Sequence, residues 1–205
     1  MIPIWNIDLL NQGKRKKNDD DSDGETTDQD DGSPPKKKHK GGVKGFNDNE
    51  IRRFIKSYKK FPQPLTRMED IAKDAELEEK ALHELVELGR LLRQTCETAL
   101  ENEAAAAAAA AAGGGGGGED KKGAVKIGGV VVSAKKLMET EGLLRPLGKV
   151  MSEDKKLRLA WSLQCGTKDA NFDVDWGTLE DSRLLSGVYE YGLGNWEDIK
   201  VSSIF

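Results

Sequence analysis

Cations on one face of a predicted helix are the residues of this sequence whose type and spacing best suit a chemical role. The apolar positions of this helix are Ile51, Phe54, Ile55 and Tyr58. Their offsets of three and four place them on one buried stripe. Arg52 and Lys56 lie off the stripe and one turn apart, which suits two neighbouring phosphates of one strand. Lys59 and Lys60 also lie off it, and solubility explains them equally well. Arg53 falls on another face and is predicted to be a surface or salt-bridge residue.

Further cations occur in two later segments and in the N-terminal tail. Lys135 and Lys136 belong to a lysine-rich stretch, and Arg183 is one of the few basic residues near the end of the sequence. We take these three as additional candidates for contact with phosphate. PPKKKHK (34–40) carries Lys36, Lys37, Lys38 and Lys40 and is typical of a nuclear-localisation patch. A basic tail that contacts nothing specific is the alternative.

The formal net charge of −4 conceals a strong segregation of charge along the chain. Residues 44–67 hold seven Lys/Arg against two Asp/Glu, and residues 121–158 hold ten against four. The intervening block 68–103 holds four against eleven, and residues 168–205 hold three against eight. A nearly neutral protein can therefore present a local basic face to phosphate. Solvated helix surfaces would produce the same pattern.

Several function classes lack their sequence signals. The two cysteines, Cys96 and Cys165, and the two histidines are too far apart for a zinc site, so we expect no metal. Both cysteines are expected to be buried free thiols of an intracellular protein. No convergent acid, base or nucleophile set is recognisable, and no GxxxxGK[ST] phosphate loop occurs, so no enzyme activity, cofactor or small-molecule substrate is expected. No apolar run reaches the roughly 18 residues of a membrane span, and the opening residues do not resemble a secretory signal.

One pattern occurs twice, 130 residues apart. Phe46 aligns with Trp176 and Glu50 with Glu180. The apolar positions that follow also align, as Phe54 with Leu184, Ile55 with Leu185, Tyr58 with Val188 and Phe61 with Tyr191. A repeated aromatic, acidic and apolar spacing of this kind predicts two tandem helical modules.

The surrounding sequence divides the chain into five segments. Helices are predicted from residue 47 or 48 to the prolines at 62 and 64, over 67–75, over 78–103, over 135–141, from Ser152 to 164 and over 179–191. One or two short strands are predicted within 124–133. The segments are a disordered tail (1–42), a first helical module (43–103), a poly-Ala and poly-Gly linker (104–122), a β-bearing bridge with a helix (123–168) and a second helical module (169–205). The alanines can prolong the third helix.

Both modules resemble one family. GFNDNEIRRFIKSYKKF (45–61) with MEDIAKDAEL (68–77) resembles the SANT module of the first subfamily of chromodomain–helicase–DNA-binding chromatin remodelers. KIGGVVVSAK (126–135) and FDVDWGTLEDSRLLSGVYEYGLGNWEDIK (172–200) resemble that family's β-bearing bridge and the start of its Myb-like SLIDE module. The resemblance implies a mainly α fold. It would consist of two Myb-like modules, SANT and an incomplete SLIDE, joined by a long helix and the bridge.

The resemblance also implies a function. In that family the SANT–SLIDE unit binds DNA that flanks the nucleosome, and Arg52 and Lys56 match positions at which the SANT helix is expected to contact DNA. We therefore expect sequence-nonspecific binding to duplex DNA and nucleosomes, a nuclear location and no membrane association. The alternative is a module that binds histone tails or other chromatin proteins. Because the sequence stops where a third SLIDE helix is expected, we also expect an uncovered apolar surface around Trp176, Leu184, Leu185, Val188 and Trp196.

Overall fold

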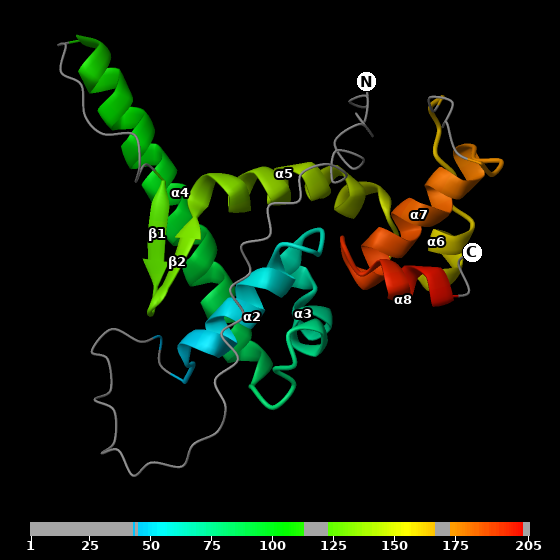
Figure 1. Ribbon diagram of the computed structural model, residues 1–205, viewed down its shortest axis with the longest axis horizontal. Coiled ribbons are helices and arrows are strands. Elements are labelled where there is room, and N and C mark those ends of the chain that lie inside the picture. Colours follow the sequence, from blue (N-terminus) through cyan, green and yellow to red (C-terminus); the bar gives the residue numbers. More distant parts are fainter. Residues whose placement is uncertain (1–42, 44, 113–122, 167–172, 203–205) are drawn as a thin grey trace. The chain divides into compact units, whose positions relative to one another are not determined.

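The computed structural model describes residues 43, 45–112, 123–166 and 173–202 (Figure 1). The described part is mainly helical with one small sheet, as predicted. Its elements are α2 (Asp48–Tyr58), the 3-10 helix η1 (Pro64–Thr66), α3 (Met68–Asp74), α4 (Leu82–Ala112), β1 (Ala124–Ile127), β2 (Val130–Ser133), α5 (Ala134–Val150), α6 (Lys155–Leu159), α7 (Thr178–Tyr191) and α8 (Trp196–Val201). The expected disorder of the tail and its localisation patch lies outside the described residues.

The start of α2 is fixed by a reciprocal cap. The Asn47 side chain accepts a hydrogen bond from the Glu50 N–H at 2.9 Å, and the Glu50 carboxylate accepts one from the Asn47 N–H at 2.8 Å. The predicted stripe is fully or almost fully buried. Its helix ends at Tyr58, ahead of two prolines that cannot continue it.

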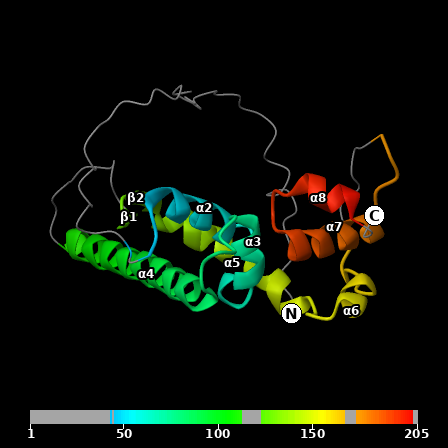
Figure 2. The ribbon, with the colours of Figure 1, turned by 90° about the horizontal axis from the view of Figure 1, so that it is seen from below.

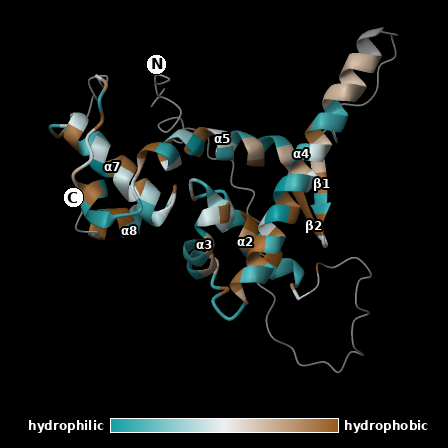
Figure 3. Ribbon diagram, turned by 180° about the vertical axis from the view of Figure 1, so that it is seen from behind, coloured by the Kyte–Doolittle hydropathy of each residue, from teal (hydrophilic) through white to brown (hydrophobic). Residues whose placement is uncertain are grey.

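The long helix α4 begins four residues later than the predicted Glu78. Lys80 holds the preceding turn against the start of α2, because its ammonium pairs with Glu50 at 3.0 Å and donates to the Gly45 carbonyl at 2.9 Å. The alanine run prolongs the helix as expected, and Ala104–Ala109 are exposed. Figure 3 shows this end of α4 in the pale brown of alanine.

Strands β1 and β2 form an antiparallel hairpin around Gly128 and Gly129, with Val125 opposite Val132 and Ile127 opposite Val130. These four side chains are buried on one face, while Lys126 and Val131 are exposed on the other. The Gly129 N–H donates to the Asp48 carboxylate at 2.9 Å. A Cβ at Gly129 would lie 2.0 Å from Asp48 Oδ2, so glycine is needed for this approach.

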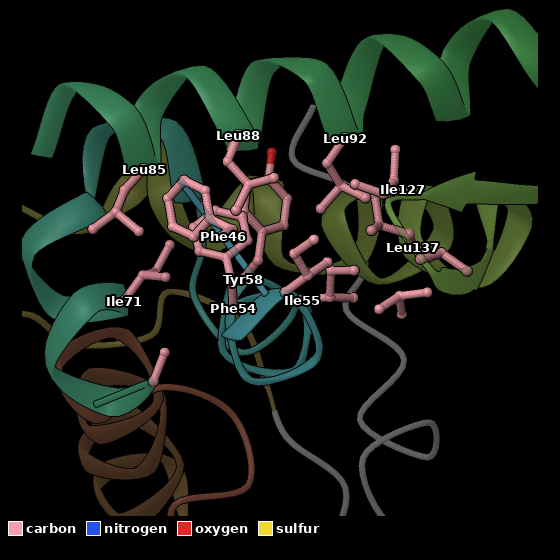
Figure 4. Packing of buried hydrophobic residues seen from close by; sticks show 14 of the residues in the cluster. Phe46, Phe54, Ile55, Tyr58, Ile71, Leu85, Leu88, Leu92, Ile127 and Leu137 are labelled. Carbon is pink, nitrogen blue, oxygen red and sulfur yellow. The ribbon is translucent and has the colours of Figure 1, made fainter. Parts of the chain in front are cut away.

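A single core joins α2, α3, α4, the hairpin and the start of α5. Figure 4 shows Leu85, Leu88 and Leu92 extending from α4 toward Phe46, Phe54 and Tyr58, with Ile71 of α3 at one end and Ile127 and Leu137 at the other. The hydrophobic cluster therefore unites residues of the predicted first module with residues of the predicted bridge.

Two helices differ from the prediction. Helix α5 (Figure 2) continues to Val150 instead of ending near residue 141. Pro146 lies inside this helix. The helix expected from Ser152 to 164 is only the five-residue α6, capped by Asp154. Leu157, Leu159 and Ala160, at and just after the end of this short helix, are exposed.

The second copy of the repeat is α7 followed by α8. Its Glu180 accepts a hydrogen bond from the Gly177 N–H at 2.9 Å, which reproduces the Glu50 contact of the first copy. This hydrogen bond lowers the pKa of Glu180. Of the apolar surface expected to be uncovered, Trp196 is 43% exposed, but Val188 is buried, and so are Tyr189 and Ile199.

Candidate nucleic-acid interface

The exposed face of α2 carries the two cations that the sequence selects first. Arg52 and Lys56 lie one turn apart, opposite the buried stripe. Arg52 donates to the Asn49 side-chain oxygen at 2.9 Å, which leaves four of its five N–H donors for a ligand. Neither cation forms an ion pair with a residue in the part of the chain that the structure describes. Their charge is therefore open to an anion.

The other basic residues of this helix and its C-terminal turn differ in their surroundings. Arg53 pairs with Glu76 at 2.9 Å, which confirms the predicted salt-bridge role. Lys59 caps the helix and is half-buried. The Lys60 ammonium lies 2.8 Å from Asp74 and 2.9 Å from the Asn195 side-chain oxygen. Lys60 is thus engaged within the protein, and its charge is balanced by a carboxylate.

Lys135 and Lys136 occupy the first turn of α5 and are exposed. Ser133 caps this helix by accepting from the Lys136 N–H at 3.4 Å. Cations at a helix N-terminus oppose the helix dipole, so helix stability does not account for two lysines here.

Arg183 lies on the exposed side of α7. The acidic residues nearest in sequence have other partners, because Glu180 accepts from the helix start and Asp181 accepts from the Trp176 indole at 2.8 Å. Lys200 of α8 pairs with Glu197 at 2.8 Å. Arg183 is therefore the freer of the two cations of α7 and α8.

These candidates fall on two groups of helices. Arg52, Lys56, Lys135 and Lys136 all belong to elements that share the large hydrophobic core, and the Gly129–Asp48 contact ties the hairpin to the start of α2. Arg183 belongs to the α7–α8 pair, which lies outside that cluster. We call the first group the SANT-like unit (43–137) and the helices α6 to α8 the C-terminal unit.

Sequence reasoning missed the residues that join these two units. The Arg67 guanidinium lies over the Tyr189 ring, 4.5 Å from its centroid, and donates to the Tyr189 carbonyl at 2.8 Å. Within the C-terminal unit, Arg158 is buried and lies 5.2 Å from the centroid of the same ring. No short-range pattern reveals these roles, because the partners of Arg67 are more than 120 residues away.

Other kinds of site find no support in the described residues. They contain no group of three His, Cys, Asp or Glu that could hold a metal ion. Cys96 is buried as expected, but Cys165, in the irregular segment after α6, is exposed. Among the described helices none is both long and apolar enough to cross a membrane.

Two helical units of repeated design, with cations on exposed helix faces, define a tandem module of the SANT type. Comparison with known proteins agrees. Residues 44–133 match the family model "CDH1/2 SANT-Helical linker 1", and residues 156–205 match "ATP-dependent helicase CHD1-2/hrp3 HTH domain". The chain is 44% identical over 160 residues to chromodomain-helicase-DNA-binding protein 1 of Homo sapiens, and the same holds for that of Gallus gallus.

The chain is therefore a region of the CHD1 type, comprising its SANT–helical linker and HTH parts. The match covers 78% of this chain but only 9% of either relative. The first family model spans α2 to β2 as one unit, in agreement with the shared core. The second begins at residue 156, so it includes most of α6 along with α7 and α8.

Proposed function

We propose that this chain binds duplex DNA without sequence preference, as the DNA-binding region of a nuclear chromatin remodeler that engages nucleosome-flanking DNA. The observation that carries the proposal is the adjacent pair Arg52 and Lys56 on the exposed face of α2. Two cations one helical turn apart, with no carboxylate partner among the described residues, suit the phosphates of one strand. The name of both relatives, chromodomain-helicase-DNA-binding protein 1, includes DNA binding, which supports the same function.

Further contacts are proposed for Lys59, Lys135, Lys136 and Arg183. Lys60 is expected to contribute least, because Asp74 already balances its charge. Lys36, Lys37, Lys38 and Lys40 are proposed to direct nuclear import. We expect affinity in the nonspecific range, about 10⁻⁴ to 10⁻⁶ M at physiological salt, because the contacts are to phosphate and not to base edges.

The test is a titration of two duplexes of unrelated sequence, followed by fluorescence anisotropy over a series of salt concentrations. Replacing Arg52 and Lys56 together by Ala should weaken binding to both duplexes. If each makes one phosphate contact, the slope of log K against log salt should fall by about 1.8 in magnitude. Both positions are exposed and Ala favours helix, so α2 should remain folded.

The matched control replaces two other exposed lysines, Lys73 of α3 and Lys149 of α5, by Ala. It therefore makes the same change in net charge. A slope that falls equally in the control would show a general charge effect. An unchanged salt slope in the variant that lacks Arg52 and Lys56 would show that α2 does not contact DNA. Affinity that depends strongly on base sequence would contradict the proposal as a whole.

The second candidate function is binding of basic peptides such as histone tails. It is favoured by exposed carboxylates of α3, α4 and the turn between them that form no ion pair with the described residues, namely Glu69, Glu78, Glu79 and Glu87. Histone-tail peptides titrated under the same salt conditions separate the two functions. Peptide binding that Glu78→Gln with Glu79→Gln weakens, together with no DNA binding, would favour the second candidate.

A further inference from the structure

A compact polar cluster joins the SANT-like unit to the C-terminal unit. The Lys60 ammonium contacts Asp74 at 2.8 Å and the Asn195 side-chain oxygen at 2.9 Å. The Asn195 amide closes the triangle by donating to Asp74 at 2.7 Å, and also to the Tyr191 carbonyl at 2.7 Å. All of these groups are partly buried, so water competes weakly for them.

The Asn195 side chain takes part in this cluster and does not cap the helix that follows it. It stands at the N-cap position of α8, where an Asn side chain ordinarily accepts from the helix start. Its side chain makes no such cap and turns to Asp74 and Lys60 instead. The contact between the units is thus formed at the expense of a local stabilising bond.

The backbone between α7 and α8 is also shaped for this contact. The Leu193 N–H donates to the Lys60 carbonyl at 2.8 Å. Gly192 has a φ of +89°, and a Cβ there would lie 3.1 Å from both Lys60 Cβ and Phe61 Cζ. The positive φ favours glycine here, and an added Cβ would make a tight contact between the two units.

Arg67 forms the other half of the junction. Its guanidinium covers the Tyr189 ring and donates to the carbonyls of Tyr189 and Glu190 at 2.8 and 3.3 Å. These carbonyls lie in the last turn of α7, where the helix dipole favours a cation. Asp70 pairs with the Arg67 Nε and holds the side chain in place.

We infer that these contacts form a rigid joint, defined by Lys60, Arg67, Asp74, Tyr189 and Asn195, which holds the two units in one orientation. Under the proposed function, on which this consequence rests, the cations of both units then meet DNA as one surface. Loosening the joint should weaken binding without removing phosphate contacts. If one tenth of the molecules then hold the binding orientation, affinity should fall about tenfold.

The experiment measures the distance between two spin labels in the free protein by pulsed electron resonance. Labels are placed at Glu87→Cys in α4 and Glu197→Cys in α8, both exposed positions outside the joint, in a Cys165→Ser background. The joint variants are Asn195→Ala, which leaves net charge unchanged, and Arg67→Lys. Arg67→Lys keeps the charge but loses the planar stacking and the two-pronged donation. Glu76→Gln, which cuts an exposed ion pair elsewhere in the SANT-like unit, is the control.

The inference expects one narrow distance distribution for the unaltered joint and for Glu76→Gln, and a broadened one for both joint variants. A distribution that is already broad with the joint intact would overturn it. So would joint variants that keep the narrow distribution. If Asn195→Ala loses helicity by circular dichroism, Arg67→Lys alone decides between these outcomes.

DNA titration of Asn195→Ala supplies a second readout. Affinity should fall while the salt slope stays the same, because no phosphate-contacting cation is removed. A changed slope would mean that the joint itself contacts DNA. The two readouts also separate the joint from the proposed function. If the unaltered chain binds no DNA but shows a narrow distance distribution that the joint variants broaden, the joint is supported and the proposed function is wrong.

Discussion

The same carboxylate position starts both copies of the repeat, but only the first copy buries it against a cation. Glu50 accepts from the Asn47 N–H and pairs with Lys80, whose ammonium also lies 5.3 Å from the centroid of the Phe46 ring. Burial by itself would raise the pKa of Glu50, but the hydrogen bonds from Asn47 and Lys80 and the nearby charges outweigh it and lower the pKa. The charged form of Glu50 therefore stabilises the fold.

Replacing Glu50 by Gln tests this contribution through its pH dependence. A group with a lowered folded-state pKa contributes stability above its unfolded pKa, and that stability is lost as the pH falls through the folded pKa. Glu50→Gln should therefore cost about 1–2 kcal/mol at neutral pH, because Gln keeps the cap but not the charge. In strongly acidic solution the cost should vanish.

Urea unfolding over a series of pH values measures this difference, with Glu79→Gln as the control. Glu79 is exposed and forms no ion pair with the described residues, so its replacement should change little at any pH. A cost of Glu50→Gln that is the same at acidic and neutral pH would show that the charge does not matter.

At the scale of elements, the pairing of α7 with α8 depends on one small residue. Gly187 is buried in the middle of α7, and a Cβ there would lie 2.7 Å from Ile199 Cγ2. Gly187→Ala should push α8 away, at a cost of about 1–3 kcal/mol that exceeds the gain from replacing a helical glycine.

Gly142→Ala in α5 is the matched control, because nothing lies within 4 Å of its added Cβ. That variant should gain about 0.5–1 kcal/mol from helix propensity. Tryptophan fluorescence during urea unfolding reports the effect of Gly187→Ala, since Trp161, Trp176 and Trp196 all lie in or beside the C-terminal unit, and circular dichroism reports the effect of Gly142→Ala on helix α5. Equal effects of the two substitutions would show that α7 and α8 do not pack closely.

The sequence predicted helices whose apolar residues recur with a strong period. It did not predict contacts between residues that lie far apart in the chain. The stripe of α2, the second copy at Glu180 and the two strands all follow local rules of spacing and capping. The delayed start of α4 depends on Lys80 reaching Glu50, and the role of Lys60 depends on Asn195, 135 residues away. Of the candidate site, the sequence therefore indicated the exposed pair on α2 but not which neighbouring lysine is internally paired.

At the scale of the whole molecule, the two units differ in how much apolar surface they bury. The SANT-like unit holds the large cluster, with Ile51, Phe54 and Leu85 fully buried. The C-terminal unit buries far fewer large side chains, chiefly Leu163, Val188, Tyr189 and Ile199. The segment after α6 supplies part of the expected missing cover, because Leu163 is buried and its N–H donates to Ser182 at 3.0 Å.

Amide hydrogen exchange should therefore be slow over residues 51–58 and 82–92 and faster over 178–191 and 196–201. Exchange rates follow local opening, which is easier where fewer apolar contacts must be broken. Mass spectrometry of peptides from the exchanged protein measures this. Equal protection in both units would mean that the joint makes them unfold together.

The bond between Gly129 and Asp48 spans 81 residues, and it has a consequence for the order in which the chain can fold during synthesis. Helices α2, α3 and the first part of α4 leave the ribosome before the hairpin exists. Ile51, which a Cβ at Gly128 would approach to 2.9 Å, then lacks the cover that the hairpin provides. The first helices must wait for residues beyond the alanine and glycine run before their core closes.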